Sequence, residues 1–131
     1  IQTINPGKAE GQLIGGNLTL MSALVGTPYL PSADGAILFL EDVGEAIYRV
    51  DRMMTQLRLS GLLDRVSGIV FGHFTDVKPN PGLGNFSLMD ILRQHCEPLE
   101  VPCYFGAMIG HVDQQSTVPV GAHPTETCIG H

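Results

Sequence analysis

The sequence predicts an α/β fold in which a mixed, largely parallel β-sheet packs against helices. Patterns typical of strands and of helices alternate at least three times along the 131 residues, which favours a parallel or mixed sheet over a β-sandwich. The strongest strand pattern, at residues 36–40, is a continuous apolar run, as expected of a strand that is buried on both faces. With this length and 44% hydrophobic residues, we expect residues 1–131 to fold as a single domain.

The first part of the chain predicts two strands and a short helix. Residues 1–4 and 9–14 have the apolar content of strands and are separated by a Pro-Gly turn. Asn17 suits the N-cap of a helix that ends at Gly26, because its side-chain oxygen can accept a hydrogen bond from the first helical turn. The Gly-Gly-Asn turn at residues 15–17 lacks the spacing of nucleotide-binding loops, so tight packing is preferred over anion binding as its role.

The central strand ends at Glu41 and Asp42 and leads into a helix. Apolar residues recur there at intervals of three and four and so share one face: Ile47, Val50, Met54 and Leu57. We expect Asp42 to be the N-cap of this helix, with Glu45 completing a reciprocal capping pair and Gly61 ending the helix. Glu41 then lies at the carboxyl edge of the sheet, where open α/β sheets bind their ligands. The alternative for Glu41 is a second, solvated carboxylate at the helix N-terminus.

The second half of the chain predicts more strands and one more helix. Strands are expected at residues 68–71, 102–107 and 117–120. The last of these can pair only at a sheet edge, because Pro119 has no N–H donor. Ser87 and Asp90 form a capping pair for a further helix. Residues 75–86, rich in Pro and Gly, are interpreted as a lid, an interface loop or a mobile excursion, and these alternatives stay open.

Composition excludes several classes of partner. The formal net charge is −6 with 7 Lys and Arg residues, so a basic face for nucleic acid is not expected. No apolar run approaches the roughly 18 residues of a membrane span. The 3 cysteines contain no C-x-x-C pair, which argues against a disulfide framework or zinc knuckle and favours a reducing compartment.

Because the sequence begins with Ile1 and not Met, we expect it to be a piece of a longer protein.

Glu41 and His111 are the two candidates for catalysis. His111 follows Gly110 at a predicted strand end, where an imidazole can act as a general base; His73 follows a similar glycine and is its main rival. Parallel strands can bring Glu41 and His111 to one sheet edge, where a carboxylate on Nδ1 would fix the imidazole tautomer. A nucleophile is missing, because no serine lies in a G-x-S-x-G turn and Cys103 lies inside an apolar strand. The residues alone supply at most two parts of a catalytic triad.

Other polar and sulfur-containing side chains allow further interpretations. One set of four is considered as metal ligands: His73, Asp76, His111 and Asp113. Their spacing matches no zinc signature, so no metal site is expected. Arg49 and Arg52 either clamp a substrate carboxylate or form a solvated helix face. The 5 methionines are interpreted as core side chains.

Five blocks of the sequence resemble the LD-carboxypeptidase family of serine peptidases, which includes the microcin C immunity peptidases. The blocks are EGQLIGGNLTLMSALVGTPYLP at residues 10–31, GAILFLEDVGEAIYRVDRMMTQLRLSG at 35–61, IVFGHF at 69–74, IGH at 109–111 and TVPVGA at 117–122. Their order and spacing are those of the family, and together they cover nearly the whole chain. The chain resembles the C-terminal domain of the family alone.

This resemblance implies a swivelling β/β/α domain and a Ser-His-Glu triad assembled across two domains. The Glu and His positions of the family fall on Glu41, in the FLED run, and on His111, in the IGH run. The serine would come from an N-terminal domain of the same protein, so we expect this chain alone to be inactive. The resemblance further implies a cytoplasmic, commonly homodimeric enzyme without a cofactor that releases terminal D-alanine from murein tetrapeptides in cell-wall recycling.

Two alternatives to this reading remain open. The first is an immunity-type peptidase that uses the same triad to cleave a microcin C-like peptide nucleotide. The second is a non-catalytic dimerisation or binding domain, in which Glu41 and His111 have capping and structural roles.

Overall fold

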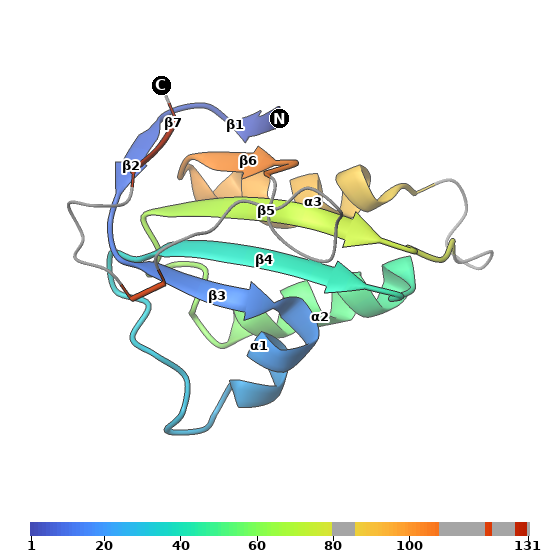
Figure 1. Cartoon of the computed structure of the whole chain (residues 1–131), viewed down its shortest axis with the longest axis horizontal. Coiled ribbons are helices and arrows are strands. Elements are labelled where there is room, and N and C mark those ends of the chain that lie inside the picture. Colours follow the sequence, from blue (N-terminus) through green and yellow to red (C-terminus); the bar gives the residue numbers. More distant parts are fainter. Residues whose placement is uncertain (80–85, 108–119, 122–127, 131) are drawn as a thin grey trace.

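The centre of the molecule is a mixed, mostly parallel sheet. The structure is a computed structural model and describes residues 1–79, 86–107, 120–121 and 128–130. Within these residues a five-stranded sheet has the order β1-β6-β5-β4-β3 (Figure 1). Its strands are β1 (Gln2–Asn5), β3 (Leu13–Asn17), β4 (Ile37–Val43), β5 (Gly68–Thr75) and β6 (Cys103–Phe105). Strands β3 to β6 pair in parallel and β1 pairs antiparallel with β6, which confirms the predicted fold class.

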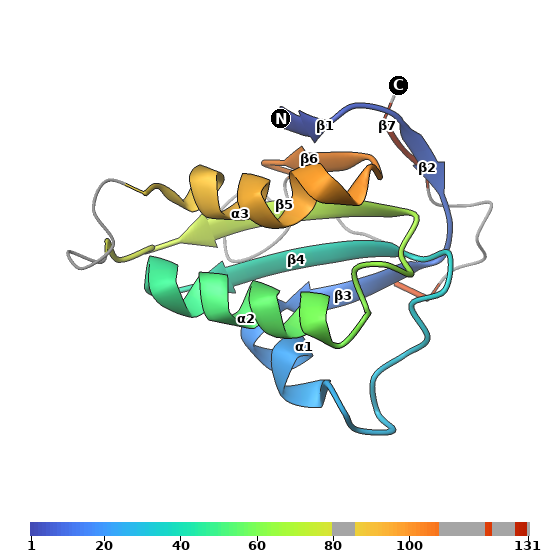
Figure 2. The same cartoon turned by 180° about the vertical axis from the view of Figure 1, so that it is seen from behind.

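Helices cover one face of this sheet. In the described part of the chain they are α1 (Leu18–Leu24), α2 (Ile47–Leu59) and α3 (Leu88–Cys96), followed by a short 3-10 turn, η2 (Glu97–Leu99). Figure 2 shows α1, α2 and α3 side by side in front of the strands. None of the helices among the described residues is long and apolar enough to cross a membrane.

A second, small sheet joins segments from near the two ends of the chain. Strand β2 (Lys8–Glu10) pairs antiparallel with β7 (Cys128–Gly130). Residues 9–14 were predicted to form one strand, and this prediction is wrong, because the segment divides between β2 and β3 in different sheets. Gly11 lies at the division, where an added Cβ would come within 2.2 Å of the Gly35 carbonyl oxygen. The backbone at Gly11 therefore lies close to that at Gly35 and leaves no room for a larger residue without a shift.

Residues 15–17 continue strand β3 instead of forming the predicted turn. Gly15 pairs with Phe39 and Gly16 with Leu40 in the parallel ladder to β4. Gly15 has φ +132° and a Cβ there would meet the Phe39 carbonyl oxygen at 1.9 Å, so no larger residue fits without a shift. The role of this glycine is close packing of two strands, in agreement with the preference for packing over anion binding.

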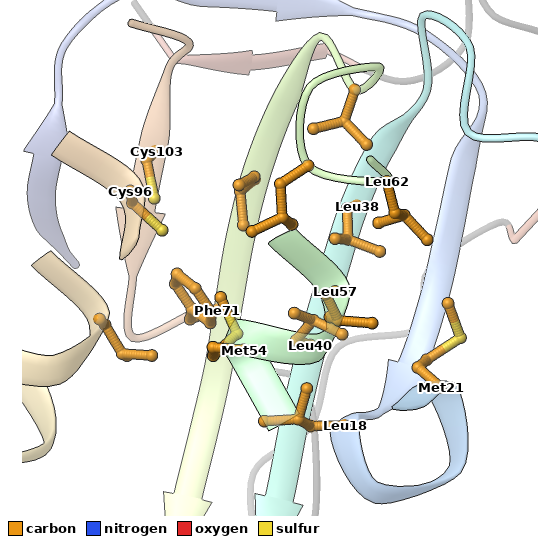
Figure 3. Close-up of a cluster of buried hydrophobic side chains, with 14 of the residues drawn as sticks. Leu18, Met21, Leu38, Leu40, Met54, Leu57, Leu62, Phe71, Cys96 and Cys103 are labelled. Atoms are coloured by element: carbon orange, nitrogen blue, oxygen red, sulfur yellow. The ribbon is translucent and has the colours of Figure 1, made fainter. Parts of the chain in front are cut away.

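The larger hydrophobic core lies between the helices and the sheet. Leu38 and Leu40 of β4 and Phe71 of β5 meet Met54 and Leu57 of α2 there (Figure 3). A smaller cluster on the other face of the sheet contains Leu13, Ile37, Phe39 and Val70. Strand β4 is therefore buried on both faces, as predicted. Three of the five methionines, Met21, Met53 and Met54, are buried core side chains as predicted, Met89 packs partly buried against the core, and Met108 lies outside the described residues.

Two of the three predicted helix caps are present. The Asn17 side chain accepts a hydrogen bond from the Leu20 N–H at 3.1 Å and caps α1. Ser87 and Asp90 form the reciprocal capping box of α3. Gly61, with φ +85°, follows directly after the C-cap residue of α2 and ends that helix as predicted.

The predicted capping of α2 by Asp42 and Glu45 is wrong. Strand β4 continues past Glu41 because Asp42 and Val43 still pair with β5, and the N-cap residue of α2 is Ala46, which makes no side-chain cap bond. Strand β5 likewise extends beyond the predicted residues 68–71 and includes His73. After it, Lys78 exchanges backbone hydrogen bonds with Glu45 and Ile47 at 3.1 Å, so the start of the predicted 75–86 loop is tied to the start of α2.

Two further expectations fall on positions outside the described residues. Residues 117–119 of the predicted edge strand at 117–120 lie outside the described residues. Residues 80–85, in the middle of the predicted 75–86 loop, also lie outside them. The strand predicted at residues 102–107 lies within the described part and is observed as the shorter β6.

Candidate active site

Glu41 lies near the carboxyl end of β4, in the middle of the parallel part of the sheet. Its side chain is buried, with 7% of the residue exposed. In the ladder to β3 it pairs with Asn17. The carboxyl ends of parallel strands form the edge at which open α/β sheets bind ligands, and Glu41 lies near this edge although β4 continues to Val43.

A β-bulge in β5 lies directly beside Glu41. Leu40 pairs with Phe71 and Asp42 with Phe74, so one residue of β4 faces two residues of β5, Gly72 and His73. Bulges are frequent next to active sites, where they redirect a side chain. The rival imidazole of the sequence analysis, His73, is therefore adjacent to Glu41 in the sheet.

Side-chain alternation places Glu41 on the face of the sheet that the helices do not cover. Leu40 belongs to the core beneath the helices, whereas Phe39 belongs to the cluster on the other face. Successive side chains of a strand point to opposite faces, so Glu41 shares the face of Phe39, and Asp42 points towards the helices. Two consecutive acidic residues thus serve two sides of the sheet.

The Asp42 side chain, on β4, accepts hydrogen bonds from the end of the neighbouring strand β3 and from the start of α1. Its Oδ1 accepts from Asn17 Nδ2 at 3.0 Å and from the Val43 N–H at 2.8 Å. Its Oδ2 accepts from the Thr19 N–H at 2.9 Å and from Thr19 Oγ1 at 2.7 Å. The carboxylate that was predicted to cap the following helix instead holds the preceding one, and sequence reasoning missed this role.

A group of charged and aromatic side chains lies on the first turns of α2. Arg49 and Arg52 both lie over the ring of Tyr48, at 5.7 and 5.8 Å from its centroid. Arg49 also forms an ion pair with Glu45 at 3.7 Å. The hydrogen bond with Tyr48, and then the charge interactions with Tyr48 and Glu45, raise the pKa of Arg49 above its ordinary value. The guanidinium groups converge on one exposed ring, and their use as a substrate clamp stays a prediction.

The serine hydroxyls of the described residues are occupied with the main chain. Ser22 and Ser60 donate to carbonyl oxygens three residues before them, at 2.9 and 2.7 Å. Ser67 donates to the Ala36 carbonyl at 3.2 Å, Ser87 caps α3, and Ser32 accepts from the Asp34 N–H at 3.5 Å. Each of these serines of the described residues thus has a main-chain partner, and the source of the nucleophile stays a prediction.

His111 lies outside the described residues, and so does Asp113. The pairing of Glu41 with His111 is accordingly still a prediction. Of the four side chains considered for a metal, only His73 and Asp76 are described. No group of three His, Cys, Asp or Glu side chains within the described ranges is arranged to hold a metal ion.

A comparison with known families identifies the kind of protein to which this site belongs. Residues 10–125 match the family model described as the LD-carboxypeptidase C-terminal domain. The chain belongs to the LD-carboxypeptidase family. The matched range includes both Glu41 and His111.

Individual LD-carboxypeptidase relatives agree in fold and in sequence. The chain is 39% identical over 115 residues to the murein tetrapeptide carboxypeptidase of Pseudomonas aeruginosa, covering 87% of this chain and 37% of that protein. It is 29% identical over 121 residues to the Microcin C7 self-immunity protein MccF of Escherichia coli, covering 88% of this chain and 33% of that protein.

A solved structure gives the same result. The muramoyltetrapeptide carboxypeptidase from Oxalobacter formigenes matches with a TM-score of 0.81 and 38% identity, covering 88% of this chain and 40% of that chain. The present chain thus spans well under half the length of these relatives.

Two buried features of this LD-carboxypeptidase domain lie on the helix side, away from Glu41. Cys96 and Cys103 are buried next to each other (Figure 3), and the hydrogen bond with Cys96, together with burial, raises the pKa of the Cys103 thiol. Cys103 is therefore a core residue, as predicted. His95, 4% exposed, pairs with Asp51 across α2 and α3, a partnership that no local sequence pattern indicates.

Proposed function

We propose that this chain is the C-terminal domain of a serine-type LD-carboxypeptidase that hydrolyses the L,D-peptide bond of murein tetrapeptides. The whole enzyme would release the terminal D-alanine in cytoplasmic cell-wall recycling. The observation that carries the proposal is the buried carboxylate of Glu41 at the carboxyl edge of the sheet, in a chain of this family. Burying a carboxylate is costly unless charged or polar partners face it, which supports a role for Glu41 in a built site.

In the proposed mechanism Glu41 and His111 act on a serine of an N-terminal domain. The serine oxygen attacks the scissile carbonyl carbon while His111 takes the hydroxyl proton, and the imidazolium then gives that proton to the leaving amine of D-alanine. Water hydrolyses the acyl-enzyme by the same route. Glu41 holds the imidazole in the required tautomer and stabilises its charged form.

The proposed location of the nucleophile in an N-terminal domain determines what we expect of this chain by itself. Because the serines of the described residues are engaged with backbone groups, we expect no hydrolysis by the family mechanism from this chain alone. Its proposed partners are the N-terminal domain, a second copy in a homodimer, and the murein peptide. The proposal is contradicted if the purified chain releases D-alanine at a rate that Glu41→Ala or His111→Ala abolishes.

The deciding experiment uses the parent protein, that is, this chain extended N-terminally by the segment with the serine. D-alanine release from a murein tetrapeptide is measured for the wild type and for Glu41→Ala and His111→Ala, with equal thermal stability as a condition. We expect each change to lower kcat about a thousandfold or more. His73→Ala is the matched variant, and loss of activity there with retention in His111→Ala would reassign the base to His73.

The similarity to the Microcin C7 self-immunity protein supports a second candidate function. At 29% identity it is weaker than the 39% identity to the murein tetrapeptide carboxypeptidase, so the murein substrate is preferred. The immunity-type peptidase would use the same triad on a microcin C-like peptide nucleotide. Parallel assays of both substrates separate the two functions, and an active parent protein that ignores the tetrapeptide would favour the immunity function.

A non-catalytic domain predicts a different result. In the catalytic arrangement Glu41→Gln removes a negative charge beside the imidazole, so the pKa of His111 falls. An NMR titration of His111 that does not change with Glu41→Gln would support a dimerisation or binding domain.

A further inference from the structure

We propose that Asp42 is a positioning residue, which aims the carboxylate of Glu41 by holding the end of β4 against the start of α1. This inference rests on the proposed function, in which Glu41 is part of the catalytic site. Asp42 points into the helix-covered side of the sheet and so acts through the backbone that it shares with Glu41.

The buried carboxyl group of Asp42 is surrounded by hydrogen-bond donors. Only 3% of the residue is exposed. Each of its two oxygens accepts two hydrogen bonds, from donors of Asn17, Thr19 and Val43, at 2.7 to 3.0 Å. Hydrogen bonds to a charged acceptor are stronger than neutral ones, and a buried carboxylate persists only with such partners. The group is therefore fixed in one orientation.

The bonds of Asp42 lead directly to the residue that faces Glu41. Asn17 is the ladder partner of Glu41 on β3. The Asn17 amide donates to Asp42 through Nδ2 and accepts from the Leu20 N–H through Oδ1. One side chain thus joins β3, the first turn of α1 and the end of β4 at the level of Glu41.

The constraint matters because the opposite side of β4 is irregular at this level. The bulge at Gly72 and His73 interrupts the regular ladder between β4 and β5 beside Glu41. Pairing with β5 therefore fixes the Glu41 backbone less tightly there than a regular ladder would. The Asp42 network on the β3 side supplies the missing constraint, and displacement of a catalytic group by about 1 Å can cost roughly a hundredfold in rate.

An asparagine at position 42 keeps the volume of Asp42 but cannot keep its hydrogen bonds. The oxygen that faces Asn17 meets an amide donor, and the oxygen that faces Thr19 meets a backbone donor. Whichever way the carboxamide turns, its NH₂ group points at an N–H donor. Asp42→Asn is therefore a nearly isosteric change that breaks one side of the network.

The control for Asp42→Asn is Asp90→Asn on α3. Asp90 also binds the N-terminus of a helix, through the Ser87 N–H at 2.8 Å, but it lies on the surface and outside the Asp42 network. Both variants and the wild type are compared in the parent protein for kcat, KM and thermal stability in the D-alanine assay. We expect Asp42→Asn to lower kcat at least about tenfold with KM within about threefold, and Asp90→Asn to leave kcat unchanged.

A second variant keeps the test decisive if Asp42→Asn fails to fold. Thr19→Val removes the hydroxyl, and with it the contacts of Oγ1 to Asp42 and to Glu45, but leaves the Thr19 N–H bond to Asp42. We expect kcat to fall at least about threefold without a change in KM. The inference is overturned if the folded variants keep kcat within about twofold of the wild type, or if Asp90→Asn loses as much kcat as Asp42→Asn.

The failure of the proposed function can be told apart from the failure of this inference. A wild-type parent protein that releases no D-alanine contradicts the proposed function. The inference is then tested on the same protein by the side-chain ¹³C carboxyl signal of Glu41. A shifted or broadened signal in Asp42→Asn but not in Asp90→Asn supports positioning of Glu41, and an unchanged signal in Asp42→Asn overturns it.

Discussion

The Nε2 atom of His95 on α3 lies 2.7 Å from Oδ1 of Asp51 on α2. His95 is buried, and within the described part of the chain its Nδ1 has no hydrogen-bond partner, whereas Asp51 is partly exposed at the rim. The pair joins the two helices on the side of the sheet opposite to Glu41, and we expect it to contribute to stability.

Removal of Asp51 should therefore destabilise the fold without affecting a sheet-edge site. In Asp51→Ala the buried imidazole loses its remaining partner, and we expect the free energy of unfolding to fall by about 1–3 kcal/mol. Chemical denaturation of the parent protein measures this. Asp64→Ala, at an exposed position, is the control, and equal losses in the two variants would contradict a special role for the pair.

The capping box of α3 predicts a pH dependence of stability. The backbone hydrogen bond from Ser87, followed by the Ser87 side chain, lowers the pKa of Asp90 below its ordinary value of 3.8. A carboxyl group whose pKa is lower in the folded state stabilises the fold above its unfolded-state pKa and loses this effect as the pH falls through the folded-state value. The difference between the unfolding midpoints of the wild type and of Asp90→Asn should be largest near neutral pH and shrink below about pH 4. A difference that does not change between pH 7 and pH 3 would contradict this assignment.

The three cysteines should differ sharply in reactivity. Cys96 and Cys103 are buried and the pKa of Cys103 is raised, whereas Cys128 is exposed. Because the thiolate is the reactive species, we expect a thiol reagent at about pH 8 to modify Cys128 quickly and the other two only after denaturation. Mass spectrometry of the labelled peptides identifies the sites. Fast labelling of Cys103 in the folded protein would show that the α3–β6 contact opens readily.

Neighbouring glycines in β3 offer a matched pair of substitutions. At Gly15 an added Cβ would meet the Phe39 carbonyl oxygen at 1.9 Å, while at Gly16 no atom lies within 4 Å. Both residues have positive φ, so both changes to alanine carry backbone strain. We expect Gly15→Ala to cost at least about 2 kcal/mol more unfolding free energy than Gly16→Ala. Similar losses would mean that β3 and β4 can separate easily at this point.

Local sequence signals predicted the elements that depend on neighbouring residues. Asn17 caps α1 and Ser87 caps α3 because each bonds a residue three positions away. Asp42 carries the same kind of local pattern with Glu45, yet pairing with β5 and donors from α1 decided its structure. A competition between a local cap and partners distant in sequence cannot be judged from spacing alone.

The candidate site was predictable to the same degree. The abrupt end of an apolar run placed Glu41 at the sheet edge, because buried strands and polar termini are visible in sequence. The bulge that brings Gly72 and His73 beside Glu41 is a property of register between two strands and has no signature in either strand alone. The same is true of His95 and Asp51, which lie on different helices.

The small β2–β7 sheet has a consequence for how this chain folds and opens. It is held by a three-residue ladder between segments from near opposite ends of the sequence. The ladder is short and the residues of β7 are exposed or half-buried, so these strands are expected to join last and to separate first. Amide hydrogens of Ala9 and Ile129 should then exchange with solvent much faster than those of β4. A protease should likewise cleave the β2 and β7 segments before it cleaves β4, the strand that carries Glu41.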